Sequence, residues 1–185
     1  MLALQGGFEA HGRMLRGLDA RVREVRVPGE LEGLDGLVIP GGESTTMTLG
    51  IAREGLAGPL RTLVMEGVPV LGSCAGLIML DRDHLDLMDM RAERNAFGRQ
   101  PRSFEVDLDV RGIDGGRAGQ TTPGRPLRAV FIRAPWIAEH GSGVEILAEA
   151  DGHPVAAREG NMLAVAFHAE LTDDDRIHRL FLSLV

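Results

Sequence analysis

The first 80 residues alternate between short apolar runs and longer segments in which apolar residues recur with helical spacing. The run at 37–39 is continuously apolar, as in a strand buried on both faces, whereas 22–27 alternates apolar and charged residues, as an edge strand does. The pattern predicts strands at 1–5, 22–27, 37–39 and 68–71, and helices at 9–18, 45–54, 60–66 and from residue 75. This alternation predicts the α/β class, with a doubly wound, mostly parallel sheet flanked by helices.

The second half of the chain is richer in strands. Apolar runs predict strands at 104–110, 129–132, 144–148, 154–158 and 163–167, with few helices between them, so we expect an antiparallel or mixed extension of the sheet. A helix is predicted at 172–184, with three aspartates in its first turn and a buried stripe made by Ile177, Leu180, Phe181 and Leu184. The segment 112–126 is rich in Gly, Arg and Thr and is predicted to be a mobile loop. No repeat or boundary is visible, so residues 1–185 are expected to form one domain.

Composition narrows the function classes. The 185 residues are 44% apolar and 25% charged, as in an ordinary globular protein. The net charge of −7 argues against a nucleic-acid surface, which needs a basic stripe. No apolar run approaches the roughly 20 residues of a membrane helix, and no signal peptide is visible. With a single cysteine there is no internal disulfide, so a cytoplasmic protein without membrane contact is expected.

The single cysteine, Cys74, stands in the sequence Gly-Ser-Cys-Ala-Gly between a predicted buried strand and a predicted helix. A sharp turn at this junction is the nucleophile elbow, which lifts a side chain out of the sheet at its carboxyl edge. The following helix N-terminus favours the thiolate form. A lone intracellular cysteine is more often an inert core residue, so the elbow is what makes Cys74 a candidate nucleophile.

A candidate base, His168, follows the apolar strand at 163–167, with Glu170 two residues later. In an extended chain these two side chains point the same way, so the carboxylate can fix the imidazole tautomer, as a triad requires. A surface His-x-Glu pair remains the alternative, because so short a motif often arises by chance. The other histidines are expected on the surface or in loops, without zinc-ligand spacing to Cys74, so no metal is expected: His11, His84, His140, His153 and His178.

A second strand-to-helix junction carries Pro-Gly-Gly-Glu-Ser-Thr at 40–45. Its two glycines let backbone N–H groups approach a substrate closely. The N–H groups of Gly42 and Ala75 could together form an oxyanion hole. The alternatives are a plain turn with Ser44 as helix N-cap, and a phosphate-binding loop, although no Gly-Lys-Ser/Thr or complete dinucleotide motif is present.

Together these segments resemble class I (triad) glutamine amidotransferases, and more narrowly the glutaminase subunit of pyridoxal 5′-phosphate synthase. Five segments carry the narrower resemblance: Leu-Ala-Leu-Gln-Gly at 2–6, Gly-Gly-Glu-Ser-Thr-Thr at 41–46, Gly-Ser-Cys-Ala-Gly at 72–76, Arg-Asn-Ala-Phe-Gly-Arg-Gln at 94–100 with Ser-Phe-Glu at 103–105, and Phe-Ile-Arg-Ala-Pro at 131–135. The segment at 94–100 is the most specific, because other glutaminase subunits do not carry it.

The resemblance implies a flavodoxin-like fold in which Cys74 is the nucleophile, His168 the general base and acid, and Glu170 the orienting carboxylate. It implies that L-glutamine is bound by Gly42, Glu43, Ser44, Arg94, Ile132 and Arg133. Ordinary surface ion pairing is the alternative for Arg94, Arg99 and Arg133. No cofactor is implied. The implied partner is a synthase subunit that uses the ammonia to build pyridoxal 5′-phosphate from a pentose phosphate and a triose phosphate, and this partner is expected to order the loop at 41–42 and so activate the glutaminase.

Three features depart from the family pattern. Ala169 stands where the family usually has proline, which removes a fixed φ and predicts looser positioning of the triad. The segment 80–94 is several residues shorter than in relatives, and the chain begins inside the first strand, where relatives have a few more residues.

Other functions remain open at this stage. They are a glutaminase subunit for histidine or purine synthesis, a non-catalytic regulatory or scaffolding subunit, and a cysteine hydrolase or chaperone-like relative. The segment at 94–100 argues against the first, the intact Cys74, His168 and Glu170 against the second, and the Gly-Gly-Glu-Ser loop against the third.

Overall fold

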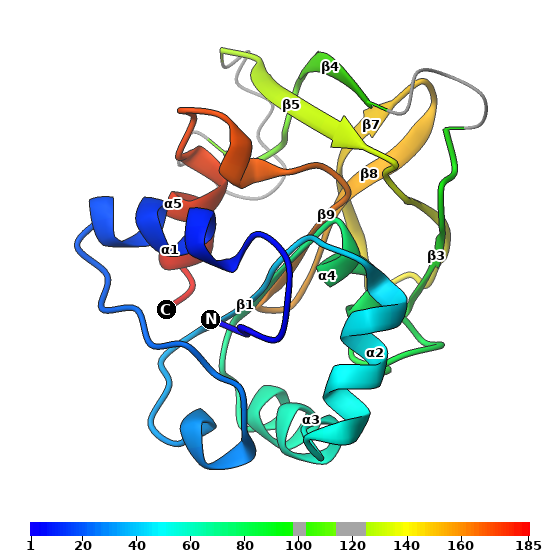
Figure 1. Ribbon diagram of the computed structural model, residues 1–185. Coiled ribbons are helices and arrows are strands. Elements are labelled where there is room, and N and C mark those ends of the chain that lie inside the picture. Colours follow the sequence, from blue (N-terminus) through cyan, green and yellow to red (C-terminus); the bar gives the residue numbers. More distant parts are fainter. Residues whose placement is uncertain (98–102, 114–124) are drawn as a thin grey trace.

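A five-stranded mixed sheet forms the centre of the protein in the computed structural model, which describes residues 1–97, 103–113 and 125–185 (Figure 1). The strand order is β1-β2-β9-β8-β7, with β1, β2 and β9 parallel and β8 and β7 added antiparallel. The strands of this sheet are β1 (Leu37–Ile39), β2 (Val70–Ser73), β7 (Glu145–Ala150), β8 (His153–Glu159) and β9 (Met162–Val165). The predicted α/β class, with a parallel first half and an antiparallel extension, is confirmed.

Helices cover the sheet, with α1 and α5 to one side of β1 and α2 and α3 to the other (Figure 1). The α-helices are α1 (Phe8–Gly17), α2 (Ser44–Arg53), α3 (Ala57–Met65), α4 (Ala75–Leu80) and α5 (Arg176–Leu182), and the 3-10 helices are η1 (Pro28–Leu31) and η2 (Ala169–Leu171). Every residue of α4 is buried, because this helix packs against β1, β2 and β9. No helix within the described ranges is long and apolar enough to span a membrane.

The register of the parallel strands brings two distant chain segments together. β2 lies between β1 and β9, with Ser73 opposite Val165 at the carboxyl ends of the two strands. The backbone N–H of Cys74 then donates to the carbonyl of Val165 across 2.8 Å. Side chains that follow β2 and β9 must therefore meet at one edge of the sheet, where ligands bind in folds of this kind.

Two smaller sheets lie beside the main one: β3 (Met90–Glu93) with β6 (Trp136–His140), and β4 (Ser103–Leu108) with β5 (Leu127–Ile132). Phe131 of β5 is fully buried between the rings of Phe104, stacked at 4.7 Å, and Phe167, edge-on at 5.7 Å. The N–H of His168 donates to the carbonyl of Val130 across 2.8 Å. Aromatic packing and this hydrogen bond together hold β5 beside the end of β9.

Several predicted elements differ from the structure. Residues 1–5 and 22–27 form no extended strand pair; they meet at one isolated parallel bridge, Leu2 with Val25. The final helix begins at Arg176 rather than 172. Its N-cap residue, Asp175, makes no side-chain cap hydrogen bond, while the Asp174 carboxylate accepts from the Arg176 N–H at 3.2 Å. The strands β3 and β6 were not predicted. Most of the predicted loop at 112–126 lies outside the described residues.

Candidate active site

The predicted elbow at Cys74 is present. Cys74 has φ 50° and ψ −103°, a region that L-residues rarely adopt and that is held only where the surroundings impose it. β2 ends one residue before it and α4 begins one residue after it. The turn has no room for larger side chains, since a Cβ at Gly76 would lie 2.0 Å from the carbonyl oxygen of Ile39. The small residues around the cysteine are therefore needed for the turn.

The predicted base and carboxylate lie together behind the elbow. His168 Nδ1 is 2.7 Å from Glu170 Oε1, and both groups are largely buried. With Nδ1 bonded to the carboxylate, Nε2 is the ring nitrogen left for Cys74. Glu170 lies in the 3-10 turn η2 rather than in an extended segment. His168 and Glu170 are nevertheless in contact, with Ala169 between them in place of the usual proline. The hydrogen-bonded pair excludes the surface His-x-Glu alternative.

The electrostatics favour an imidazolium at His168. Burial disfavours the charged ring, but hydrogen bonds to Cys74 and Glu170 outweigh this and raise the pKa of His168 to about 10. Burial also disfavours the Glu170 carboxylate, yet its contacts with His11 and His168 hold the pKa of Glu170 well below its usual value. The site therefore keeps an anionic carboxylate next to a protonated imidazole.

Two histidines that were expected on the surface are instead fully buried behind Glu170. His11 Nε2 of α1 is 3.1 Å from Glu170 Oε2, and His11 Nδ1 is 2.8 Å from His178 Nε2 of α5. The prediction that both histidines lie on the surface was wrong, because it was based on the polarity of the side chain alone. A signal was available: His11 is four residues before the buried Leu15, and His178 is three residues before the buried Phe181, so both lie on buried stripes.

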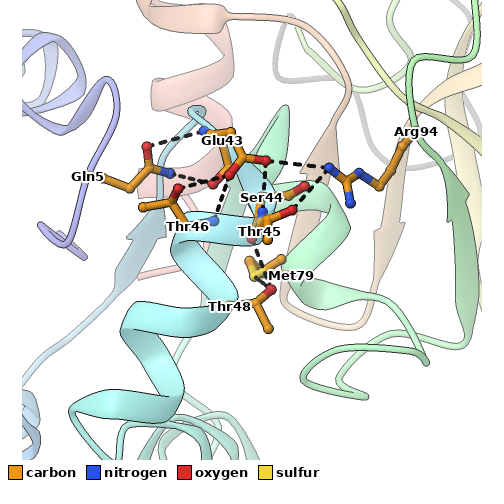
Figure 2. Close-up of polar contacts among 8 residues, drawn as sticks. All are labelled: Gln5, Glu43, Ser44, Thr45, Thr46, Thr48, Met79 and Arg94. Carbon is orange, nitrogen blue, oxygen red and sulfur yellow. Dashed lines mark hydrogen bonds and ion pairs between the residues drawn. The ribbon is translucent and has the colours of Figure 1, made fainter.

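The Gly-Gly loop passes directly over the triad. A Cβ at Gly41 would lie 2.6 Å from Cε1 of His168 and 3.3 Å from Cβ of Cys74, so only glycine fits there. The Gly41 carbonyl accepts from the Gly7 N–H at 2.9 Å. The Gln5 side chain, which was not predicted as a site residue, makes two hydrogen bonds to the Glu43 backbone, Nε2 to the carbonyl at 3.0 Å and Oε1 from the N–H at 3.2 Å (Figure 2).

Glu43 is the N-cap of α2, a role that was assigned to Ser44 as an alternative. Its carboxylate accepts from the N–H groups of Thr45 at 3.0 Å and Thr46 at 2.7 Å, and these hydrogen bonds lower the pKa of Glu43 to about 2. Arg94 reaches the same carboxylate, with Nη2 3.4 Å from Oε1 (Figure 2). The structure thus brings two predicted glutamine-binding residues together, while the Ser44 residue itself is buried.

The other predicted glutamine-binding residues lie at the end of β5. Ile132 is the last residue of this strand and is half-buried, and Arg133 follows it, exposed, with φ 45°. Both come shortly after Val130, whose carbonyl is bonded to His168. Part of the specific segment 94–100, including Arg99, lies outside the described residues. Among the described residues no group of three or more His, Cys, Asp or Glu side chains could hold a metal ion.

Comparison with known proteins identifies the family. The model of the SNO glutamine amidotransferase family matches residues 1–185. The curated pyridoxal 5′-phosphate synthase subunit PdxT of Frankia alni is 49% identical over 100% of this chain and 93% of its own length, and that of Streptomyces coelicolor is 48% identical over 100% and 92%.

Solved structures agree with this. A structure described as a glutamine amidotransferase superposes with a TM-score of 0.88 at 42% identity, covering 99% of this chain and 96% of the other. PurLQS from Thermotoga maritima, at 16% identity and a TM-score of 0.73 over 95% of this chain and 91% of the other, shows likeness of fold alone. The chain belongs to the SNO glutamine amidotransferase family.

Proposed function

We propose that this protein hydrolyses L-glutamine to L-glutamate and ammonia through a thioester on Cys74. The observation that carries the proposal is the assembled triad: a strained elbow cysteine whose partner His168 is held 2.7 Å from the buried Glu170. A cysteine of this kind attacks an amide carbon once a neighbouring imidazole has taken its proton. Membership of the amidotransferase family supports glutamine as the amide.

The reaction follows from the two protonation states of His168. The Cys74 thiolate attacks the side-chain amide carbon, and the His168 imidazolium gives its proton to the departing nitrogen, which leaves as ammonia. Neutral His168 then takes a proton from water, whose oxygen attacks the thioester and releases glutamate while the thiolate is restored. The negative oxygen formed in both steps is stabilised by the N–H groups of Gly42 and Ala75.

Glutamine binding is assigned to Gly42, Glu43, Ser44, Arg94, Ile132 and Arg133. A zwitterionic amino acid needs a cation beside its carboxylate, and the guanidinium of Arg94 or Arg133 offers a two-pronged donor. Both oxygens of Glu43 already accept hydrogen bonds from the start of α2, and one of them also contacts Arg94. The ammonium group of glutamine therefore competes with Arg94 for the Glu43 carboxylate, or displaces Arg94 from it.

The ammonia is passed to the synthase subunit that builds pyridoxal 5′-phosphate, in the cytoplasm, where the single free cysteine stays reduced. The support is the name of the relatives, which are subunits of that synthase at 48–49% identity. A protein-enclosed path keeps the ammonia out of water and so avoids its protonation. The two hydrogen bonds between the Gln5 side chain and the Glu43 backbone lie beside the Gly-Gly loop. Partner binding at this loop would change the geometry of the oxyanion hole.

Glutamate release tests the proposal. The protein is mixed with the synthase subunit and glutamine, and the wild type is compared with Cys74→Ala and with Cys74→Ser, which retains a hydroxyl. We expect glutamate from the wild type alone. Release from Cys74→Ala at the wild-type rate would rule the mechanism out. A diazo-ketone analogue of glutamine should add its mass at Cys74, and modification at another residue would contradict the assignment of the nucleophile.

A further inference from the structure

Behind the triad lies a row of three buried ionisable side chains that comes from three separate elements. Glu170 of η2, His11 of α1 and His178 of α5 are joined by contacts of 3.1 Å and 2.8 Å. Both imidazoles are fully buried, and neither His11 Nε2 nor His178 Nδ1 has a hydrogen bond of full geometry among the described residues, so the 3.1 Å approach of His11 Nε2 to Glu170 Oε2 is an ion-pair contact. Burying two imidazoles costs free energy that apolar side chains of similar size would not. The mechanism above uses neither ring.

The polar atoms of this row restrain one another. An ionised carboxylate only accepts, so the nitrogen of His11 that faces Glu170 must carry a proton. The other nitrogen of His11 shares one hydrogen bond with Nε2 of His178, in which either ring can donate. Within the described residues this is the one hydrogen bond of the His178 ring, so His178 holds the orientation of His11 and, through it, the contact at Oε2 of Glu170.

The two oxygens of Glu170 are therefore held separately. Oε1 faces His168 at 2.7 Å, and Oε2 faces His11 at 3.1 Å, with the hydroxyl of Ser73 at 3.4 Å from Oε2. A Cβ at Gly7 would lie 2.8 Å from Oε1, so the N-terminal end of α1 packs on the carboxylate, where the helix dipole favours a negative charge. Rotation of the carboxylate away from His168 would break the contact with His11.

We propose that His11, backed by His178, is a positioning residue that keeps Glu170 ionised and aimed at His168. The proposal deepens the proposed glutaminase function and rests on it for its kinetic consequence. It assigns a role in the reaction to a side chain that touches neither substrate nor cysteine. It also accounts for the contact that His11 and His178 make between α1 and α5 behind the active site. His178 acts only through His11, whose orientation it restrains.

The titratable groups next to Glu170 are His168 and His11, and the next layer contains His178 and Asp175 of α5. Burial and the neighbouring His11 lower the pKa of His178 to about 4, so this ring stays neutral at physiological pH. Loss of His11 would leave the buried carboxylate with one fewer donor, which raises the pH at which Glu170 takes up a proton.

The test compares His11→Leu with His11→Gln, whose amide N–H can replace the donor at Nε2, and with His140→Leu as the matched change at an exposed histidine. In complex with the synthase subunit, His11→Leu should lower kcat roughly 10- to 100-fold, as expected for the loss of one polar contact to a charged group, with KM unchanged. The acid limb of kcat/KM should move to higher pH. His11→Gln should recover most of kcat and the wild-type limb, and His140→Leu should match the wild type.

A second measurement needs no turnover. Cys74 is the only cysteine, so the rate of its alkylation by iodoacetamide reports the thiolate–imidazolium pair directly. The acid limb of the alkylation rate should move to higher pH in His11→Leu but not in His11→Gln. Thermal unfolding checks that both variants fold. The proposal would be overturned if the acid limb of alkylation in His11→Leu stayed at the wild-type pH, or if it moved equally in His11→Leu and His11→Gln. A wild type without glutaminase activity would refute the proposed function, while the alkylation profile would still decide the role of His11.

Discussion

Gly41 shows how tightly the backbone is packed on the proposed catalytic pair, Cys74 and His168. A methyl group at this position would lie 2.6 Å from Cε1 of His168, 2.9 Å from its Nδ1 and 3.3 Å from Cβ of Cys74. None of these atoms is at the end of a flexible side chain, since the His168 ring is tied to Glu170 and Cys74 lies in a strained turn. Even a single methyl group here must therefore displace the catalytic pair.

Gly41→Ala should lower kcat by about 100-fold, because a displacement on the order of 1 Å at reacting groups has that effect. The free energy of unfolding should fall by about 1–3 kcal/mol, as for an overpacked core. Gly58→Ala is the control: nothing lies within 4 Å of that methyl group, so activity should stay and stability should rise slightly. Wild-type kinetics in Gly41→Ala would contradict the close approach.

His178 gives stability a pH dependence in a defined window. Its pKa is lowered from 6.5 to about 4 by burial and by His11, so the folded state resists protonation that the unfolded chain accepts. The stabilisation is therefore complete above pH 6.5 and is lost as the pH falls towards 4. Glu170, whose pKa is also lowered, acts in the same direction below about 4.5.

In His178→Gln the decline of unfolding free energy between pH 6.5 and 4.5 should be shallower than in the wild type. One proton corresponds to at most about 1.4 kcal/mol per pH unit. Urea titrations at successive pH values measure the slope. His140→Gln, at an exposed histidine, should leave it unchanged; equal slopes in all three proteins would contradict the assignment.

At the scale of elements, α2 begins where it does because of Glu43. Its carboxylate satisfies two of the N–H groups that the first turn of a helix leaves free. The same residue is fastened to Gln5 through its backbone and to Arg94 through its side chain (Figure 2). Glu43 therefore connects the start of α2, the loop over the triad and the arginine of the proposed glutamine pocket.

Glu43→Gln should lower the melting temperature at pH 7, because the amide accepts through one oxygen where the carboxylate uses two. The pKa of Glu43 is lowered from 4.5 to about 2, so the advantage of the wild type is present above 4.5 and should shrink as the pH falls below it. Glu149→Gln removes the same charge from an exposed position on β7 and should have no such effect. A difference in melting temperature between the wild type and Glu43→Gln that does not depend on pH would count against the capping role of the Glu43 carboxylate.

The elements show which parts of the fold the sequence could predict. Buried parallel strands such as β1 and β2 are continuously apolar, so their pattern is visible without tertiary context. β3 and β6 were missed because both carry charged residues on an exposed face and exist through pairing with each other. The residues of the proposed triad could be predicted because they lie in short motifs directly after predicted strands.

The residues behind the triad could not be predicted in the same way. His11 and His178 are 167 positions apart, and nothing in either helix alone indicates a buried carboxylate between them. Helical spacing to Leu15 and Phe181 indicates that the two rings are buried, but it does not identify the group that they contact. Tertiary contact with Glu170 decides the matter, and only the folded chain shows it.

For the whole molecule, the central place of β2 joins the two halves of the chain. β2 pairs with β1 from the first half and with β9 from the second, and the two smaller sheets pack on this framework. One continuous apolar cluster includes residues from Met1 to Phe181. No boundary divides the cluster within the described ranges, which is why unfolding should be cooperative.

Urea unfolding should give one midpoint by far-UV circular dichroism and by fluorescence of the single tryptophan, Trp136. This residue lies in β6, outside the main sheet, so it is a separate probe from the helices. Coincident transitions would agree with one domain over residues 1–185. Two separated midpoints would show that the small sheets melt on their own.

The placement of β9 beside β2 also has a consequence for synthesis of the chain. Cys74 leaves the ribosome early, but the strand that lies beside its own, and the imidazole and carboxylate that follow that strand, are translated some ninety residues later. A nascent chain of 160 residues would contain the thiol, the elbow and the glycine loop, but no base. In the proposed mechanism Cys74 therefore lacks its base until translation is nearly complete, and a product truncated before His168 should have no glutaminase activity.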